Sequence, residues 1–253
     1  MNLFDLTGKA ALITGASRGI GRAIAVAMAD AGADLALVAR SPQGLAETAR
    51  LAEEYGHKAF VIQADVTQQE AVEGAVAAAV EQLGQVDILV NNAGGSNFVV
   101  PFSDLRLPGW DKIMKLNLSS AVYACHAIGT HMRGRGSGSI INVASVAGVS
   151  SAPFLAPYGA AKAGLISLTK SLAVEWAQAG IRVNALCPGW TATDLNRSLW
   201  QDSQASKATV AQVPMQRWGR AEEMAGPAVF LASDASSYMT GQVLLIDGGQ
   251  TAI

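Results

Sequence analysis

The chain has 253 residues, half of them hydrophobic and 15% charged, and its 18 Lys and Arg against 20 Asp and Glu give a net charge of −2. This composition excludes a disordered chain. The near-neutral balance, with a pI of 5.9, excludes the strongly basic surface that binds nucleic acid or anionic lipid. No apolar run approaches the roughly 20 residues of a membrane helix. We therefore expect no nucleic-acid and no membrane partner.

The sequence also gives information on the cellular compartment and on metal binding, through its cysteines, its histidines and its first residues. Cys125 and Cys187 cannot form a disulfide framework, and the three histidines show no metal-ligand spacing with them. The first residues include an acid where a signal peptide would be basic. We expect a cytoplasmic protein without a metal site.

Short aliphatic runs alternate with longer alanine-rich stretches over the first 90 residues. The runs are nearly continuous in Val, Ile, Leu and Ala, which is typical of parallel strands buried on both faces. The predicted strands are Lys9–Ile13, Asp34–Ala39, Ala59–Gln63 and Asp87–Val90. The stretches between them end in glycine and predict the helices Ile20–Ala31, Gly44–Glu54 and Gln69–Leu83. Crossovers of this length predict a parallel sheet with helices on both faces.

The same alternation continues along the rest of the chain. It predicts the helices Trp110–Met132, Tyr158–Gln178 and one near Glu222–Leu231, and the strands Ser139–Val143, Arg182–Leu186 and Gln242–Ile246. Gly226-Pro227 predicts a kink in the last helix, because proline lacks a backbone donor. The segment from Trp190 to Pro214 shows no clear periodicity and predicts a lid over about residues 190–214. No linker divides residues 1–253, so we expect a single α/β domain around a doubly wound parallel sheet of about seven strands.

A glycine-rich turn joins the first strand to the first helix. It reads Thr14-Gly15-Ala16-Ser17-Arg18-Gly19-Ile20-Gly21. At such a turn the unpaired N–H groups and the helix dipole can hold a pyrophosphate, as in a Rossmann-like fold. The spacing G-x-x-x-G-x-G differs from the dinucleotide pattern G-x-G-x-x-G. The glycines alone would also fit a tight turn, and the strand-to-helix context favours a cofactor.

The end of the second strand bears on which cofactor binds. A site for NAD places an acid there, whereas this strand ends in Ala39-Arg40-Ser41 and Asp34 lies at its other end. An arginine beside the ribose would pair with a 2′-phosphate, and Arg18 in the glycine turn is a second candidate. The alternative is that Arg40 is simply a solvated residue at the end of the strand, with no role in binding the cofactor. We expect NADP(H) to be preferred, with NAD(H) possible.

Tyr158 and Lys162 lie four residues apart at the start of a predicted helix, so both project from one face. A tyrosine is a poor acid–base catalyst at pH 7, but a cation one turn away, with a nicotinamide cation nearby, favours its phenolate. We therefore expect a lowered pKa for Tyr158. Ser145 directly follows a predicted strand and belongs to the same sheet edge as the glycine turn.

These motifs together resemble the short-chain dehydrogenase/reductase family in its 250-residue form. The resemblance rests on the glycine turn, Asn91-Asn92-Ala93-Gly94, Asn117, Ser145, Tyr158, Lys162, and Pro188-Gly189 followed by Thr191 and Thr193. It covers nearly the whole chain, down to the closing stretch Gly241 to Gly249.

The resemblance implies a role for each matching residue. Tyr158 is implied as the general acid in reduction and the base in oxidation, with Ser145 bonded to the same substrate oxygen. Lys162 is implied to bind the nicotinamide ribose, and Asn117 to hold a water of the proton relay. The expected cofactor residues are Gly15, Ser17, Arg18, Gly19, Ile20, Gly21, Arg40, Ser41, Asp65, Val66, Asn92, Ala93, Gly94, Tyr158, Lys162, Pro188, Gly189, Thr191 and Thr193. The stretch Asn91–Gly94 could equally be a simple turn that ends its strand.

The expected substrate pocket lies between three segments. They are the loop from Ser145 to Tyr158, residues 95–98, and the segment 190–214, with Trp190 expected to contact substrate beside Ser145 and Tyr158. Arg197 and Lys207 are the basic residues on the last segment, and the remaining candidates are apolar. This cavity favours a neutral ketone or secondary alcohol, although the tryptophans could simply pack inside the lid.

Several functions remain open from the sequence. Relatives in the family include 3-oxoacyl-carrier-protein reductases, for which Arg133 and Arg135 could dock an acidic carrier, and NAD-dependent sugar, polyol or hydroxysteroid dehydrogenases. A catalytically silent cofactor-binding protein is a further alternative. The family also implies a homotetramer, through the helices Trp110–Met132 and Tyr158–Gln178 and through the last strand with Thr251–Ile253. These faces could instead be buried within one subunit.

Overall fold

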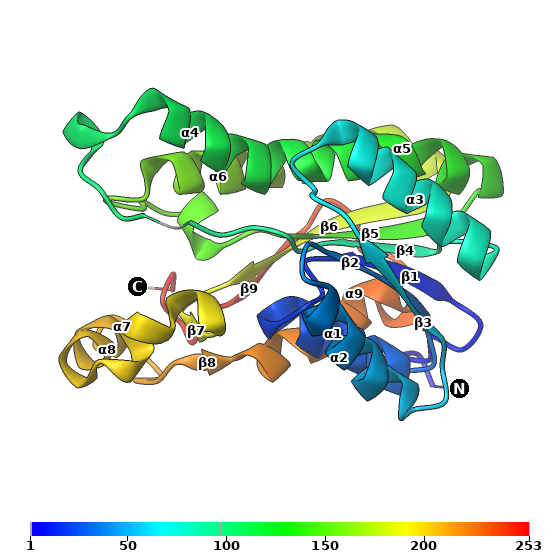
Figure 1. Ribbon diagram of the computed structural model, residues 1–253, viewed down its shortest axis with the longest axis horizontal. Helices are drawn as coiled ribbons and strands as arrows, with labels where there is room; N and C mark the ends of the chain where they lie inside the picture. The colour runs from blue at the N-terminus through cyan, green and yellow to red at the C-terminus, as the bar shows by residue number, and fades with distance from the viewer. Residues whose placement is uncertain (1, 97, 253) are drawn as a thin grey trace.

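The computed structural model describes residues 2–96 and 98–252, and a parallel sheet forms their centre (Figure 1). Within these residues the main sheet has seven strands in the order β3-β2-β1-β4-β5-β6-β9. The strands are β1 (Ala10–Thr14), β2 (Asp34–Ala39), β3 (Ala59–Gln63), β4 (Ile88–Asn91), β5 (Gly138–Val143), β6 (Ile181–Pro188) and β9 (Val243–Ile246). The order reverses between β1 and β4, which is where a doubly wound sheet binds its ligand. The predicted fold class, a single Rossmann-like α/β domain, is confirmed.

Helices cover both faces of this sheet. One face carries α1 (Gly19–Asp30), α2 (Pro42–Glu53) and α9 (Ala225–Ala232), and the other carries α3 (Gln69–Leu83), α4 (Leu107–Met114), α5 (Ser120–Arg135) and α6 (Ala156–Trp176) (Figure 1). Alanines let the helices approach closely, since Ala25 and Ala29 of α1 are fully buried in the core. Gly84 ends α3 with a φ of +75°, a left-handed conformation that favours glycine.

The predicted helix Trp110–Met132 is longer and less regular than expected. A π-helical stretch, Lys115–Ser119, separates α4 from α5. Such a stretch inserts one residue into a helical turn and often marks a functional position. The periodicity of the sequence carries no signal for it, because an inserted residue only shifts the apolar pattern slightly.

The predicted kink at Pro227 is wrong. A 3₁₀ turn, Ala221–Met224, precedes α9, and Pro227 falls in the first turn of that helix. The backbone N–H groups of a first turn have no intrahelical partner, so proline removes no bond there. The helix therefore begins later than predicted instead of bending.

The segment 190–214 contains local structure that its sequence does not reveal. It holds β7 (Thr191–Ala192), α7 (Arg197–Gln201) and α8 (Ser203–Val210), and β7 pairs with β8 (Gly219–Arg220). Figure 1 shows these short elements beyond the carboxyl end of the sheet, apart from its layers of long helices. The Trp190 and Trp218 rings pack edge to face at 5.6 Å between centroids. Trp190 thus contributes packing at the base of the segment.

The part of the chain that the structure describes contains neither a membrane-spanning helix nor a group of metal-binding side chains. None of its helices is long and apolar enough to cross a membrane. None of its His, Cys, Asp and Glu side chains gather in a group that could hold a metal ion.

Candidate active site

The glycine turn lies directly against the loop that follows β4. A Cβ on Gly15 would come within 2.7 Å of Asn92 Nδ2 and 2.9 Å of Ala93 Cα. The Asn92 amide donates to the carbonyls of Thr14 at 2.9 Å and Gly15 at 3.1 Å, and the Ala93 N–H donates to Thr14 Oγ1 at 3.1 Å. Gly15 also has a φ of +68°, so both its conformation and its surroundings require glycine. Asn92 and Ala93 therefore end a strand and brace the turn.

The expected adenosine-binding residues surround the end of β2. The side chains of Arg18 and Arg40 are exposed, which leaves both guanidinium groups accessible to an anion. The Ser41 hydroxyl accepts the Gly44 N–H at 3.2 Å and so caps α2. The Asp65 carboxylate accepts the Thr67 N–H at 3.0 Å; this bond lowers the pKa of Asp65, and the charge of Arg40 adds to the effect. Arg40 and Asp65 thus lie close enough for their charges to interact, just after β2 and β3.

Three elements bring Ser145, Tyr158 and Lys162 together. Ser145 follows β5 and its hydroxyl accepts the Ala147 N–H at 3.2 Å, while the other two lie in the first two turns of α6. The Lys162 ammonium lies 5.7 Å from the centre of the Tyr158 ring and donates to the Val143 carbonyl at 2.8 Å. A Cβ on Gly94 would lie 3.1 Å from Lys162 Nζ. The β4 loop, the end of β5 and α6 therefore converge on one ammonium group.

Burial controls the protonation of this pair. Lys162 is only 3% exposed, and burial lowers its pKa to about 8. Burial also raises the pKa of Tyr158, while a hydrogen bond with Ser145 acts in the opposite direction. The pKa of Tyr158 is therefore raised and not lowered as expected from the protein's own groups, because desolvation of the phenolate outweighs the Ser145 hydrogen bond.

Asn117 lies at the centre of the π-helical stretch, and both ends of its side-chain amide are hydrogen-bonded. Its Oδ1 accepts the Gly95 N–H at 2.7 Å, and its Nδ2 donates to the carbonyls of Gly95 at 2.9 Å and Ile113 at 3.0 Å. Both N–H donors of this amide are used, and Oδ1 keeps one lone pair. The Asn117 side chain therefore holds the β4 loop in place beside Lys162.

The segment after β6 meets the glycine turn and the β4 loop. A Cβ on Gly19 would lie 3.5 Å from Thr193 Cγ2, and one on Gly95 would lie 2.8 Å from Leu195 Cδ2. Gly189 packs against the residue that follows β9, where a Cβ would come within 2.7 Å of Asp247 Cα. The remaining expected residues here are Pro188 at the end of β6 and Thr191 in β7. Of the expected pocket segment 95–98, Asn97 lies outside the described residues.

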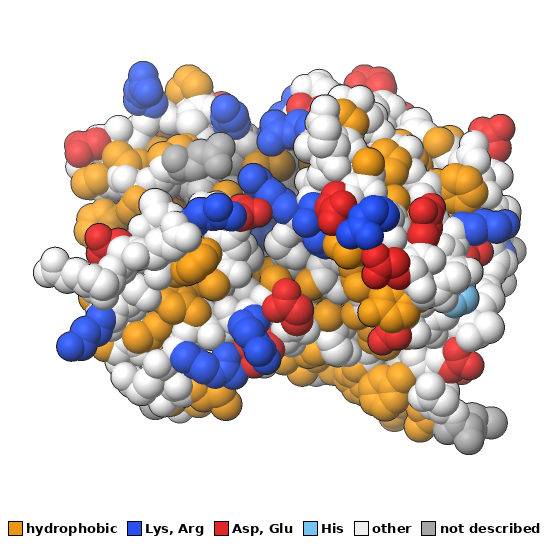
Figure 2. Space-filling model, turned by 60° about the horizontal axis from the view of Figure 1, so that its bottom comes forward, with side chains coloured by type: hydrophobic (Ala, Val, Ile, Leu, Met, Phe, Trp, Pro, Cys, Tyr) orange, Lys and Arg blue, Asp and Glu red, His pale blue; other side chains and the backbone are white. Residues whose placement is uncertain are grey.

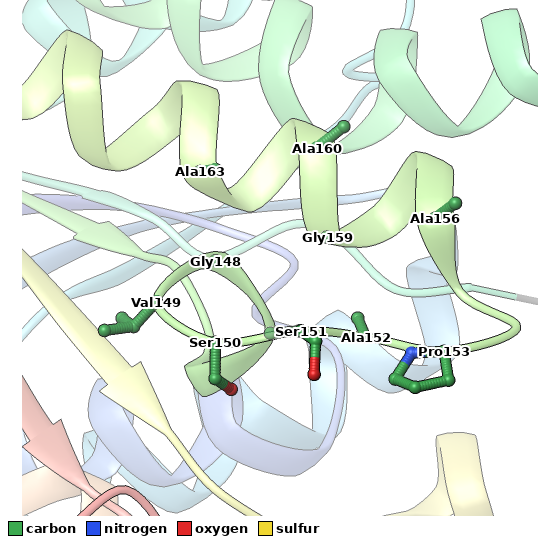
Figure 3. A pocket seen from close by; sticks show the side chains of 11 residues that line it. Gly148, Val149, Ser150, Ser151, Ala152, Pro153, Ala156, Gly159, Ala160 and Ala163 are labelled. Atoms are coloured by element: carbon green, nitrogen blue, oxygen red, sulfur yellow. The ribbon is translucent and has the colours of Figure 1, made fainter.

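A hollow of about 450 Å³ is lined by the loop that follows Ser145 and by the start of α6 (Figure 3). Its lining consists of small side chains from this loop and from the start of α6, namely Ala147, Gly148, Val149, Ser150, Ser151, Ala152, Pro153, Ala156, Gly159, Ala160 and Ala163. Figure 3 shows Ser150 and Ser151 pointing away from α6. Tyr158 and Lys162 do not line this hollow, so it lies beside the candidate site and not over it.

The two arginines considered for a carrier protein lie at the wrong end of the molecule. The Arg135 guanidinium bonds the Asp87 carboxylate at 2.8 Å, and Arg133 lies over the Trp176 ring. Asp87 directly precedes β4, at the amino edge of the sheet, whereas Ser145 lies at the carboxyl edge. Helix α5, whose 16 residues span about 24 Å, separates these two edges. Within one subunit, Arg133 and Arg135 therefore lie at the opposite edge of the sheet from Ser145.

Comparisons with known proteins agree with this geometry. Residues 15–251 match the family described as enoyl-(acyl carrier protein) reductase. The chain is 40% identical to the gluconate 5-dehydrogenase of Gluconobacter oxydans (strain 621H), covering 99% of this chain and 97% of that one. It is 38% identical to 3beta-hydroxysteroid dehydrogenase 2 of Eggerthella lenta, with coverages of 98% and 96%.

Two solved structures show the same fold. The gluconate 5-dehydrogenase from Burkholderia cenocepacia J2315, in complex with NADP and tartrate, is 38% identical with a TM-score of 0.94, covering 100% of this chain and 98% of that one. Levodione reductase is 36% identical with a TM-score of 0.95, and the coverages are 98% and 99%. The chain belongs to the short-chain dehydrogenase/reductase family. It is an NAD(P)-dependent oxidoreductase of alcohol and carbonyl substrates.

Proposed function

We propose that this protein is an NADP(H)-dependent oxidoreductase that interconverts a ketone and a secondary alcohol, with Tyr158 as the general acid and base. The observation that carries the proposal is the convergence of Ser145, Tyr158 and the buried Lys162 ammonium at the carboxyl edge of the sheet. The glycine turn lies at the same edge, where ligands of doubly wound sheets bind.

Each residue of the site has a role in the proposed reaction that follows from its chemistry. In the reductive direction the Ser145 hydroxyl donates a hydrogen bond to the carbonyl oxygen, and Tyr158 transfers its phenolic proton to that oxygen. Its raised pKa keeps this proton in place at neutral pH. The Lys162 ammonium offers donors to the ribose hydroxyls, while the N–H groups around Gly15 and Gly19 bind the pyrophosphate. The bound nicotinamide supplies the hydride.

Electrostatics at the end of β2 favour NADP(H). Arg18 and Arg40 are exposed cations on two adjacent turns, and they offer a 2′-phosphate two charged partners. Asp34 is at the opposite end of β2, where its carboxylate accepts the Lys58 N–H at 2.9 Å. Among the similar solved structures, the gluconate 5-dehydrogenase from Burkholderia cenocepacia J2315 was in complex with NADP.

The surroundings of the site favour a neutral, partly apolar substrate. Val99, Val149, Phe154 and Leu195 are large apolar side chains on the bordering segments, and each is at least half exposed. Arg197 is paired with Asp194, which reduces its availability to a substrate carboxylate. Several relatives bear the names of sugar-acid dehydrogenases, including the gluconate 5-dehydrogenase of Gluconobacter oxydans. Oxidation of a sugar acid is therefore the second candidate.

Replacing Tyr158 by Phe removes only the phenolic oxygen. We expect turnover to fall by at least about a hundredfold, because general acid catalysis is lost. Cofactor affinity and melting temperature should stay close to wild type, as measured by fluorescence titration and thermal unfolding. Tyr238 is fully exposed, and Tyr238→Phe is the matched control. Wild-type turnover in Tyr158→Phe would refute the assigned role.

Steady-state kinetics over a substrate panel tests the cofactor and the substrate class together. The panel contains cyclic and aryl ketones, β-keto esters, steroids and keto sugar acids, each with NADPH and with NADH. We expect a higher kcat/KM with NADPH, and higher kcat/KM for the neutral ketones than for the acids. Higher values with NADH would overturn the proposed cofactor, and a preference for acids would select the second candidate. Binding of cofactor without turnover of any compound would indicate a catalytically silent protein.

The outer surfaces of the fold support a homotetramer. Val174 of α6 is 80% exposed, Val122 of α5 is 40% exposed, and both lie on helices that cover the same face of the sheet. Leu245 lies on β9, an edge strand of the sheet, and is 37% exposed. These apolar positions are only partly covered within one subunit. Ile253, at the end of the expected second interface, lies outside the described residues.

Light scattering of the purified protein measures the mass in solution. We expect four times the chain mass of 26.1 kDa. The mass of one chain would contradict the tetramer, while the proposed chemistry would be untouched by that result.

A further inference from the structure

The glycine turn and the first turn of α2 lie in direct contact. A Cβ on Gly44 would lie 2.9 Å from both the Cβ and the carbonyl oxygen of Ser17. The glycine turn carries Arg18, and the residues that lead into α2 include Arg40. The contact between the two turns therefore sets the spacing of the two cations proposed above for the 2′-phosphate.

Arg22, one turn into α1, bonds to both of these turns. Its Nη2 donates to the Ser17 carbonyl at 2.6 Å and to the Gly44 carbonyl at 3.3 Å. Its Nε donates to Thr48 Oγ1 at 3.0 Å. A guanidinium presents its N–H groups in a rigid planar fork, so this one side chain can hold two backbone segments at a fixed separation.

Thr48 completes the brace from α2. It is fully buried, and its Oγ1 lies 2.9 Å from the Ala16 carbonyl and 3.0 Å from the Gly44 carbonyl. A hydroxyl has a single proton, so Thr48 donates to one of these carbonyls while it accepts from Arg22. Only the bond to Ala16 ties α2 to the glycine turn, because Gly44 lies one turn earlier on α2 itself.

The carbonyls of the glycine turn that accept these hydrogen bonds also fix the direction of the N–H groups in the same peptides. A trans peptide holds its C=O and N–H on opposite sides. The Ser17 carbonyl points to Arg22, so the N–H of Arg18 points to the opposite side of the turn. An anion-binding turn needs N–H groups that are held in this way.

We propose that Arg22 is a positioning residue for the 2′-phosphate of NADP(H). It holds the turn that carries Arg40 against the turn that carries Arg18. This inference rests on the proposed cofactor. Within residues 2–96 and 98–252, the Arg22 side chain bonds to the backbone of the two turns and to Thr48, and not to Tyr158 or Lys162. Its loss should therefore weaken selective binding of the phosphorylated cofactor without slowing the chemical step.

Calorimetric titration with NADP⁺ and NAD⁺ measures this effect without any turnover. We expect Arg22→Met to weaken NADP⁺ binding about tenfold more than NAD⁺ binding. Arg22→Lys should be intermediate, because an ammonium cannot reproduce the fork. The control is Arg50→Met on α2, where an exposed arginine pairs with Glu47 and Glu54. That variant should bind both cofactors like wild type, and kcat at saturating NADPH should stay within about twofold in every variant.

The outcomes separate this inference from the proposed cofactor. If wild type binds NAD⁺ more tightly than NADP⁺, the proposed cofactor is wrong and the inference falls with it. If wild type prefers NADP⁺ and Arg22→Met keeps that preference, the inference alone is wrong. Equal weakening of both cofactors would also overturn it. Should Arg22→Met fail to fold, Thr48→Val removes the bridging hydroxyl at nearly constant shape and is read by the same two titrations.

Discussion

The burial of one ammonium group is the constraint on which the site depends. A charge removed from water is unfavourable unless close polar partners replace the lost hydration. For Lys162 the structure provides the Val143 carbonyl at 2.8 Å, and it leaves the neighbouring position 94 without a side chain. The Asn117 amide then fixes the adjacent Gly95 peptide through two hydrogen bonds. The end of β5, the π-helical stretch and the glycine of the β4 loop thus all contribute to the space and the polar contacts that the buried Lys162 ammonium requires.

A chain of buried polar side chains keeps α6 in register with the sheet. The Asn91 amide donates to Asn142 Oδ1 at 2.9 Å, and the Asn142 amide donates to Thr169 Oγ1 at 2.9 Å. These bonds join β4, β5 and α6 inside the core, where unmade hydrogen bonds are costly. Because Lys162 lies two turns before Thr169 on the same helix, the chain also fixes the height of Tyr158 and Lys162 above the sheet edge. Stability and catalysis therefore depend on the same contacts.

The sequence predicts the regular part of this structure well, because that part follows local rules. Each predicted strand of the sheet overlaps an observed one and differs at its ends by at most two residues, as for Arg182–Leu186 against Ile181–Pro188. Buried parallel strands and glycine-terminated helices leave clear patterns in the chain. The grouping of Ser145, Tyr158 and Lys162 was also predictable, since strand ends and one helical turn define it.

The remaining differences arise from contacts that no local pattern encodes. The engagement of Asn117 depends on Gly95, 22 residues away, and the position of Arg135 depends on its pairing with Asp87. The Tyr158 pKa changes direction because burial is a property of the whole fold. Arg22 carries no motif of its own, and only the meeting of two turns reveals its bonds. Long-range packing, more than sequence pattern, decides these features.

The pH dependence of NADPH binding tests the role of the buried ammonium most directly. Below about pH 8, the pKa of Lys162, the side chain is charged and can donate to the cofactor; above it the charge is lost. The dissociation constant should therefore be nearly constant from about pH 6.5 to about pH 7, about double at pH 8 and rise steeply above it, and this rise should be absent in Lys162→Met. A dissociation constant for wild type that stays flat to about pH 10, or an equal rise in Lys162→Met, would contradict the account.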